Sequence, residues 1–216
     1  MIDASTEVNA VARQVASRQL EAGEARIARL ARTYDAPVDD LWDACTNPER
    51  LPRWFLPVSG ELRLGGRYQL EGNAGGTVER CDPPHSFTAT WEYADRVSWI
   101  EVRLTPQADA QTRLELDHIA LVADDDKWAE FGPGAVGVGW DLALIGLQLH
   151  LSTGRPVNPE EVQAWGASPE GHRFVRVSCE RWRDADIAAG ADPAAAARAA
   201  QRTAAFYTGA PAPAGS

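Results

Sequence analysis

The sequence has little cysteine, and the cysteines it has are unpaired in the chain. Cys45, Cys81 and Cys179 are odd in number and far apart, with no CxxC pair and no histidine nearby at ligand spacing. Disulfide frameworks and structural zinc sites need such pairs, so the sequence supports neither. No two of the four histidines share a helix face, and we expect no metal site.

Positive charge is also scarce. Lys and Arg number 21 against 31 Asp and Glu, which gives a formal net charge of −10. This balance repels phosphate backbones and anionic membrane surfaces at long range. The basic residues are scattered among acids and form no run. We therefore expect neither nucleic acid nor a membrane as a partner.

Long apolar runs are absent. No stretch of 18 consecutive apolar residues occurs, and the N-terminus (MIDASTE) lacks the basic and apolar regions of a signal peptide. We therefore expect a soluble, cytoplasmic protein. The composition, 44% hydrophobic and 24% charged, is close to that of globular domains. The length of 216 residues favours one core with an elaboration.

The N-terminal part of the chain predicts a helix followed by a strand. Val8 and Val15, with apolar residues between them, recur at helical spacing, which predicts a leader helix in residues 1–23. Residues 24–35 suit a first strand. Pro37 can then open a short helix, because proline is tolerated in the first helical turn.

The pattern changes to strict alternation between about residues 58 and 120. Successive runs alternate apolar and polar residues, and they are separated by turn signals such as Gly65-Gly66 and Asp82-Pro83-Pro84. This pattern predicts an antiparallel meander with one buried face and one wet face.

A long helix is predicted after the meander, ending at Thr153-Gly154. Glycines at 137, 139 and 146 interrupt its composition and indicate close backbone approach or space left for another group. Its apolar stripe consists of Val136, Trp140, Leu144, Leu147 and Leu151.

Residues 155–208 predict a helical C-terminal extension. Asn158-Pro159, Ser168-Pro169 and Asp192-Pro193 each place a capping residue before a proline, and the third helix is rich in alanine. We expect these helices to dock on the sheet domain or on a second subunit. Residues 209–216 are small and predict a disordered tail.

Several segments between about residues 25 and 153 resemble, in the same order, a known family. The segments are Ala36–Ala44, Thr46–Leu51, Trp54-Phe55, Gly65–Tyr68, Asp82–Pro84, Thr90-Trp91, Thr112–His118 and Gly139–Leu147. Together they resemble the bacterial START-like (SRPBCC) proteins grouped with the activator of heat-shock-protein-90 ATPase.

The resemblance implies an α+β helix-grip fold for residues 24–154. In this fold a curved antiparallel sheet of six to seven strands wraps around a long C-terminal helix, with a cavity between them. Members of the superfamily bind hydrophobic small molecules, cyclise or dehydrate polyketides, or act as adaptors, and the fold does not choose among these functions.

An apolar cavity with a few orienting polar groups is therefore the leading hypothesis for the site. A collapsed core filled by the same side chains is the alternative. The expected cavity residues are Tyr68, Arg80, Trp91, Ile100, Val102, Leu116, His118, Trp140 and Leu144.

Two polar residues decide what such a cavity can do. Strand alternation places His118 on the face of Leu116, where an imidazole could orient a carbonyl or move a proton, although a lone histidine is more often a core residue. Arg80 is expected on the face of Val78, where it could meet a ligand carboxylate or form an ion pair at the sheet rim. His150 is expected as a cation at the helix terminus.

Three functions follow. The first is a non-enzymatic START-like domain, without a cofactor, that binds a hydrophobic or amphipathic small molecule. The second is a polyketide cyclase or dehydratase-like enzyme with His118 as acid or base. The third is a co-chaperone-like or homodimeric interaction module that uses residues 155–208. The chain has neither a GxSxG elbow nor a P-loop, which favours binding over catalysis and leaves no other candidate catalytic residue.

Overall fold

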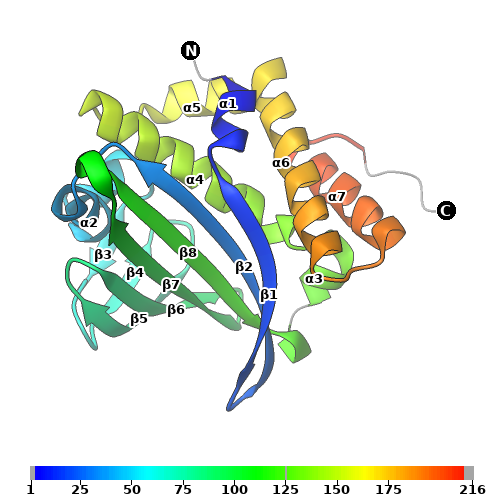
Figure 1. Cartoon of the computed structure of the whole chain (residues 1–216), viewed down its shortest axis with the longest axis horizontal. Helices are drawn as coiled ribbons and strands as arrows, with labels where there is room; N and C mark the ends of the chain where they lie inside the picture. Colours follow the sequence, from blue (N-terminus) through cyan, green and yellow to red (C-terminus); the bar gives the residue numbers. More distant parts are fainter. Residues whose placement is uncertain (1–2, 125, 212–216) are drawn as a thin grey trace. The chain divides into compact units, whose positions relative to one another are not determined.

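The computed structural model describes residues 3–124 and 126–211 (Figure 1). Its strands are β1 (Ala12–Leu20), β2 (Gly23–Tyr34), β3 (Val58–Gly60), β4 (Arg67–Leu70), β5 (Gly75–Asp82), β6 (Ser86–Tyr93), β7 (Arg96–Pro106) and β8 (Thr112–Leu121). Its α-helices are α1 (Ala4–Asn9), α2 (Val38–Thr46), α3 (Asp126–Phe131), α4 (Gly134–Thr153), α5 (Pro159–Gly166), α6 (Pro169–Ala188) and α7 (Pro193–Thr208). Short 3-10 turns are η1 (Leu51–Arg53), η2 (Ala108–Ala110) and η3 (Val122–Asp124).

The strands form one sheet in the order β1-β2-β8-β7-β6-β5-β4-β3. From β3 to β8 each strand pairs antiparallel with the next one in the chain, which confirms the predicted meander. The α+β class and the helix-grip fold with its long helix are confirmed as well. Within the described residues the sheet has eight strands, one more than the upper limit of the prediction.

The additional strand is β1, and the prediction of a leader helix over residues 1–23 is wrong for most of that range. Only Ala4–Asn9 is helical, capped by Asp3, whose carboxylate accepts the Thr6 N–H at 2.6 Å. The reason for the error is that a spacing of four, as between Val11 and Val15, fits one helical turn and also two strand periods. Pairing in the sheet decides between them.

The chain folds into two compact units. Unit 1 comprises Met1–Leu30, Leu121–Leu142 and Asn158–Ser216, and unit 2 comprises Ala31–Ala120 and Ala143–Val157. This division differs from the predicted boundaries at 23/24 and 154/155, because the N-terminal segment and the C-terminal helices belong to the same unit. The predicted disordered tail, 209–216, falls mostly on residues 212–216, which lie outside the described residues.

In unit 1, helix α6 is the central element. It packs against α1, β1 and α7, and α3 packs against α7. Phe174 and Trp182 of α6 are almost completely buried. The predicted starts of the three C-terminal helices are confirmed, since the side chains of Asn158, Ser168 and Asp192 accept backbone N–H groups in the first turns of α5, α6 and α7.

In unit 2, α2 covers part of the sheet. Trp42 of α2 meets Phe87 of β6 edge-on, with ring centroids 6.1 Å apart. The hydroxyl of Tyr34, at the end of β2, donates to the carbonyl of Leu144 in α4 at 3.2 Å. These contacts place the second half of α4 against the end of β2.

Helix α4 is apolar as well as long. Of the helices in the described ranges, it alone has the length and composition to cross a membrane, yet 56% of its apolar window is buried inside the protein. A buried core helix has this property too, and α4 carries the fully buried Asp141.

Candidate functional site

Cross-strand register brings most of the predicted cavity residues onto one face of the sheet. Tyr68 lies opposite Gly76, Ile100 opposite His118, and Val102 opposite Leu116. In an antiparallel pair, opposed residues point to the same face. We call this surface of unit 2 the apolar face; it consists of Tyr68, Val78, Phe87, Ala89, Trp91, Ile100, Val102, Leu104, Leu114, Leu116 and His118.

His118 is the one imidazole on the apolar face, and its side chain is buried. The residue is only 7% exposed, and the edge of the Trp91 ring lies against it with centroids 6.3 Å apart. Burial lowers the pKa of His118 from 6.5 to about 4. At neutral pH the ring is therefore uncharged, with one donor and one acceptor nitrogen.

Tyr68 has its polar end occupied by the backbone. Its hydroxyl donates to the carbonyl of Thr90 at 2.6 Å. Burial, helped by the charge of Glu92, raises the pKa of Tyr68 well above its usual range. The phenol is therefore held in place on the apolar face. Because it stays protonated at neutral pH, it cannot act as a base.

Arg80 does not lie on the apolar face, and this part of the prediction is wrong. The β5–β6 register shifts between Val78 and Arg80, so that Arg80 lies opposite Thr88, on the other face of the sheet. The bulge adds one residue and so reverses the alternation that places every later side chain. The Arg80 side chain is exposed.

The other face of the same strands is charged. Arg103 donates to Glu115 at 2.7 Å, to Asp117 at 3.0 Å and to Glu101 at 3.1 Å. Asp117 is completely buried although it belongs to this face. The two faces of the meander therefore differ sharply in polarity.

The two predicted cavity residues of α4 fall in different units. Leu144 is 3% exposed and belongs to unit 2. Trp140 precedes it by one helical turn, is half-buried, and belongs to unit 1.

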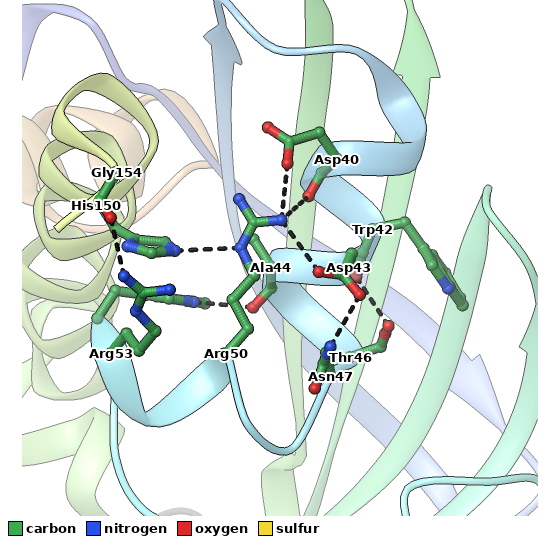
Figure 2. A network of polar contacts seen from close by, with 11 residues as sticks. Asp40, Trp42, Asp43, Ala44, Thr46, Asn47, Arg50, Arg53, His150 and Gly154 are labelled. Atoms are coloured by element: carbon green, nitrogen blue, oxygen red, sulfur yellow. Dashed lines mark hydrogen bonds and ion pairs between the residues drawn. The ribbon is translucent and has the colours of Figure 1, made fainter. Parts of the chain in front are cut away.

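A polar network centred on Arg50 joins α2 to the end of α4 (Figure 2). The Arg50 guanidinium donates to Asp40 at 2.7 Å and to Asp43 at 3.0 Å. The hydrogen bond from Asn47, followed by that from Arg50, lowers the pKa of Asp43. Sequence reasoning missed this role, although Arg50 lies in the family-like segment Thr46–Leu51.

His150, expected as a cation at the helix terminus, is a member of this network. Its Nε2 lies 3.1 Å from Arg50 Nε, and because a guanidinium only donates, Nε2 must accept. Its Nδ1 then carries the proton and donates to the carbonyl of Arg155 at 3.0 Å. Figure 2 shows the His150 ring directed at Arg50.

Neighbouring contacts fix the same region. Arg53 donates to the carbonyl of Gly154 at 2.8 Å, and the Trp54 indole donates to the carbonyl of Ala44 at 2.8 Å. The dashed contacts in Figure 2 join Arg50, Arg53 and Trp54 to other residues of the protein. The network is therefore an anchor for α2 and the end of α4.

A second buried polar cluster, in unit 1, surrounds Asp141. Its carboxylate receives hydrogen bonds from Arg13 at 2.9 and 3.0 Å, from Ser178 at 2.6 Å and from Trp182 at 3.1 Å. Burial raises the pKa of Asp141, and Arg13 opposes that rise. The cluster joins β1, α4 and α6, and its acceptor oxygens are used by protein donors.

Groups for metal or nucleophilic chemistry do not gather in the part of the chain that is described. No set of three or more His, Cys, Asp or Glu side chains there could hold a metal ion. Burial raises the pKa of Cys45 and of Cys179 to about 12. Both side chains are therefore thiols at neutral pH, which are poor nucleophiles.

Comparison with known proteins gives a family and several related structures. Residues 35–152 match the family described as "Activator of Hsp90 ATPase homolog 1-like protein". The crystal structure of CalU16 from Micromonospora echinospora is 36% identical, with a TM-score of 0.66, over 82% of this chain and 98% of that one. The solution structure of the same protein has a TM-score of 0.68.

Two more distant structures share the fold alone. DynU16, from the dynemicin biosynthetic locus, is 23% identical with a TM-score of 0.52, over 60% of this chain and 48% of its own. PFC0360w from Plasmodium falciparum, an HSP90 activator, is 22% identical with a TM-score of 0.50, over 60% of this chain and 97% of its own. No curated protein matches.

Proposed function

Because the chain belongs to the family of Activator of Hsp90 ATPase homolog 1-like proteins, we propose that it binds a hydrophobic or amphipathic small molecule on the apolar face of unit 2. The START-like fold is a ligand-binding fold, which supports this proposal. The ligand would lie between the sheet and the second half of α4, with His118, Trp91 and Leu144 among the residues in contact with it.

The observation that carries the proposal is the buried, uncharged imidazole of His118 on a face made mostly of aliphatic and aromatic side chains. Small-molecule sites combine an apolar lining with a few polar groups that orient the ligand. A neutral imidazole can donate to a carbonyl or accept from a hydroxyl. The charged face offers no comparable surface, because its carboxylates are engaged by Arg103.

The same imidazole favours binding over a cyclase or dehydratase activity. A general acid or base works best when its pKa lies near the operating pH. With a pKa of about 4, His118 holds almost no proton to give at neutral pH and is a weak base. Its chemistry suits orientation of a ligand better than proton transfer.

The test is a titration with 1-naphthol, an aromatic ring system with one hydroxyl, followed by calorimetry and by the amide chemical shifts of β6, β7 and β8. We expect saturable binding that His118→Phe weakens about fivefold, since one hydrogen bond is worth about 1 kcal/mol. His85→Phe is the matched control, because His85 is exposed.

Two outcomes would count against the proposal. One is shift changes confined to residues outside the apolar face. The other is an equal loss of 1-naphthol affinity in His85→Phe and His118→Phe, because His85 is exposed and His118 is buried. Native mass spectrometry of the protein from its source would identify a retained ligand directly.

We also propose a cytoplasmic location. The three cysteines are free thiols, and thiols persist in a reducing compartment.

A further inference from the structure

Unit 1 contains a pocket that neither the family assignment nor the sequence pointed to. It has a volume of about 540 Å³ and is lined by the β1–β2 hairpin, α3, the end of α6 and the start of α7. Small-molecule sites have volumes of about 300–1,000 Å³. All of its lining residues belong to unit 1.

The pocket exists because its helical wall consists of very small side chains. The connection between α6 and α7 contributes Ala189, Gly190 and Ala191, and the first turns of α7 contribute Ala195, Ala196 and Ala199. A methyl group or a hydrogen at each position cannot fill the space beside the hairpin. The alanine-rich sequence of α7 therefore leaves a pocket beside the helix.

One wall carries a buried carboxylate that the protein leaves unpaired. Asp186 is 9% exposed, and no residue of the described ranges donates a hydrogen bond to its carboxylate or forms an ion pair with it. A Cβ placed on Gly132, another lining residue, would lie 3.9 Å from Asp186 Oδ2. Burial raises the pKa of Asp186, and Arg26 opposes the rise only from a distance.

The one basic side chain in the lining is already engaged. The Arg26 guanidinium lies over the Trp128 ring, 5.5 Å from its centroid. It forms no ion pair with Asp186 within 4 Å in the described structure. The remaining charged lining residue is Glu24, so the lining has two carboxylates and one cation.

Buried polar groups in proteins are almost always paired, and an unpaired buried charge is costly. Asp186 lines the pocket, so a cation or a donor small enough to enter beside the alanine walls can pair with its carboxylate. An anionic ligand would meet Asp186 and Glu24. We propose that this pocket binds a small organic amine, with its ammonium group on Asp186 and its apolar body against the alanine wall.

The probes for the test share one compact hydrocarbon cage and differ in charge: 1-adamantanamine, 1-adamantanol and 1-adamantanecarboxylate. Each is titrated into the full chain at neutral pH and followed by calorimetry and by amide chemical shifts. We expect the amine to bind at least tenfold more tightly than the other two, with shifts at Gly132, Gly190 and Ala195. Equal affinity for the three probes, or no saturable binding of the amine, overturns the proposal.

Two variants and a control make the test specific. Asp186→Asn should remove the preference for the amine, and it should still fold because it removes an unpaired buried charge. Ala195→Leu should abolish binding by filling the pocket while Asp186 keeps its charge. Asp184→Asn is the matched control, since Asp184 is exposed on the same helix and pairs with Arg183.

Unchanged amine binding in Asp186→Asn contradicts the proposal, as does loss of binding in Asp184→Asn to the same extent. The amide shifts separate this site from the apolar face. A 1-naphthol response in β6 to β8 without an amine response at Gly132 would support the proposed function and refute this second site.

Discussion

Single side chains in this protein take their chemical state from what surrounds them. His118 and His150 are both buried histidines, at 7% and 2% exposure. His118 is uncharged because burial disfavours its cation. His150 instead accepts a hydrogen bond from a guanidinium. The sequence shows two histidines in apolar surroundings, but it does not show which partner each one meets.

The depressed pKa of His118 predicts a pH dependence of stability. Between pH 6.5 and about 4 the unfolded chain binds a proton at His118 that the folded chain does not. Stability from this group is therefore fully present above pH 6.5 and is lost as the pH falls through the window, by about 3 kcal/mol in total. Urea unfolding of the wild type and of His118→Gln across this window measures the difference.

We expect the stability advantage of the wild type over His118→Gln to shrink as the pH falls. His85→Gln serves as the control, and its curve should run parallel to that of the wild type. A constant difference between the wild type and His118→Gln at every pH would show that His118 takes up its proton equally in both states.

The Arg50 network predicts a large effect from one substitution. Arg50→Met removes the donor to His150 and the partner of Asp40 and Asp43. We expect the free energy of unfolding to fall by about 2–3 kcal/mol, because hydrogen bonds to charged groups are the stronger ones and His150 is left buried without its donor. Thermal and urea unfolding measure the change.

Arg63→Met is the comparison for this prediction. Arg63 also forms an ion pair, with Glu61 at 2.7 Å, but both side chains are more than half exposed. Exposed pairs contribute little, so the change should stay within about 1 kcal/mol. Equal effects of the two substitutions would refute the anchoring role of Arg50.

At the scale of elements, the glycines of α4 are explained by close approach to other residues. A Cβ at Gly137 would lie 2.2 Å from the Trp182 ring, and a Cβ at Gly146 would lie 2.5 Å from the carbonyl oxygen of Trp54. The sequence left open whether these glycines meet backbone or leave space. The structure shows contact with an aromatic ring of α6 in one case and with a backbone carbonyl in the other.

Gly137→Ala should therefore destabilise unit 1. Alanine favours a helix over glycine by about 1 kcal/mol, but the clash with Trp182 should reverse that gain and cost about 1–3 kcal/mol overall. Gly139→Ala lies two residues along the same helix, where the new Cβ would meet only the Tyr207 hydroxyl at 3.3 Å. The Gly139→Ala substitution should leave the free energy of unfolding nearly unchanged. Thermal unfolding of both variants checks the order, and a reversed order would contradict it.

The ion pair between Arg13 of β1 and Asp141 of α4 should also contribute to the free energy of unfolding, because it joins two elements. Both side chains are at most 3% exposed. Arg13→Met leaves a buried carboxylate without its countercharge, and we expect a loss of about 3–5 kcal/mol. The double variant Arg13→Met/Asp141→Leu should recover part of that loss. A double variant less stable than Arg13→Met alone would refute this explanation, and chemical denaturation distinguishes the two.

At the scale of the whole molecule, the C-terminal helices cannot be treated as a removable extension. Unit 1 is assembled from both ends of the chain. The N–H of Ala4 donates to Glu170 at 3.0 Å, and Ser178 and Trp182 of α6 hold Asp141. Most of the predicted 155–208 segment, from Asn158 onward, therefore belongs to the same unit as α1 and β1.

Deletion of residues 158–216 should expose the partners of α6 and abolish the structure of unit 1. We expect the amide protons of α1 and β1 to lose their protection against hydrogen exchange, because buried Val8 and Asp141 would face water. Hydrogen exchange on the full and the shortened chain measures this. Retained protection in β1 after the deletion would show that the C-terminal helices are separable.

Local signals explain what could be predicted. The capping residues Asn158, Ser168 and Asp192 satisfy N–H groups two or three positions away, so the starts of α5, α6 and α7 were visible in the sequence. Alternation also placed Ile100, Val102, Leu116 and His118 on one face, because a strand without a bulge keeps its period of two.

The sequence by itself determined the family, the α+β class, the meander and the helix starts, since each depends on near neighbours along the chain. Only the tertiary structure decided that residues 12–20 are a strand, that the bulge turns Arg80 outward, and that Asp186 faces a pocket. The physical reason is the same in each case. In each case the deciding partner is another element of the folded chain, which the residue's own local pattern does not show: β2 for β1, the β6 register for Arg80, and the alanine wall of α7 for Asp186.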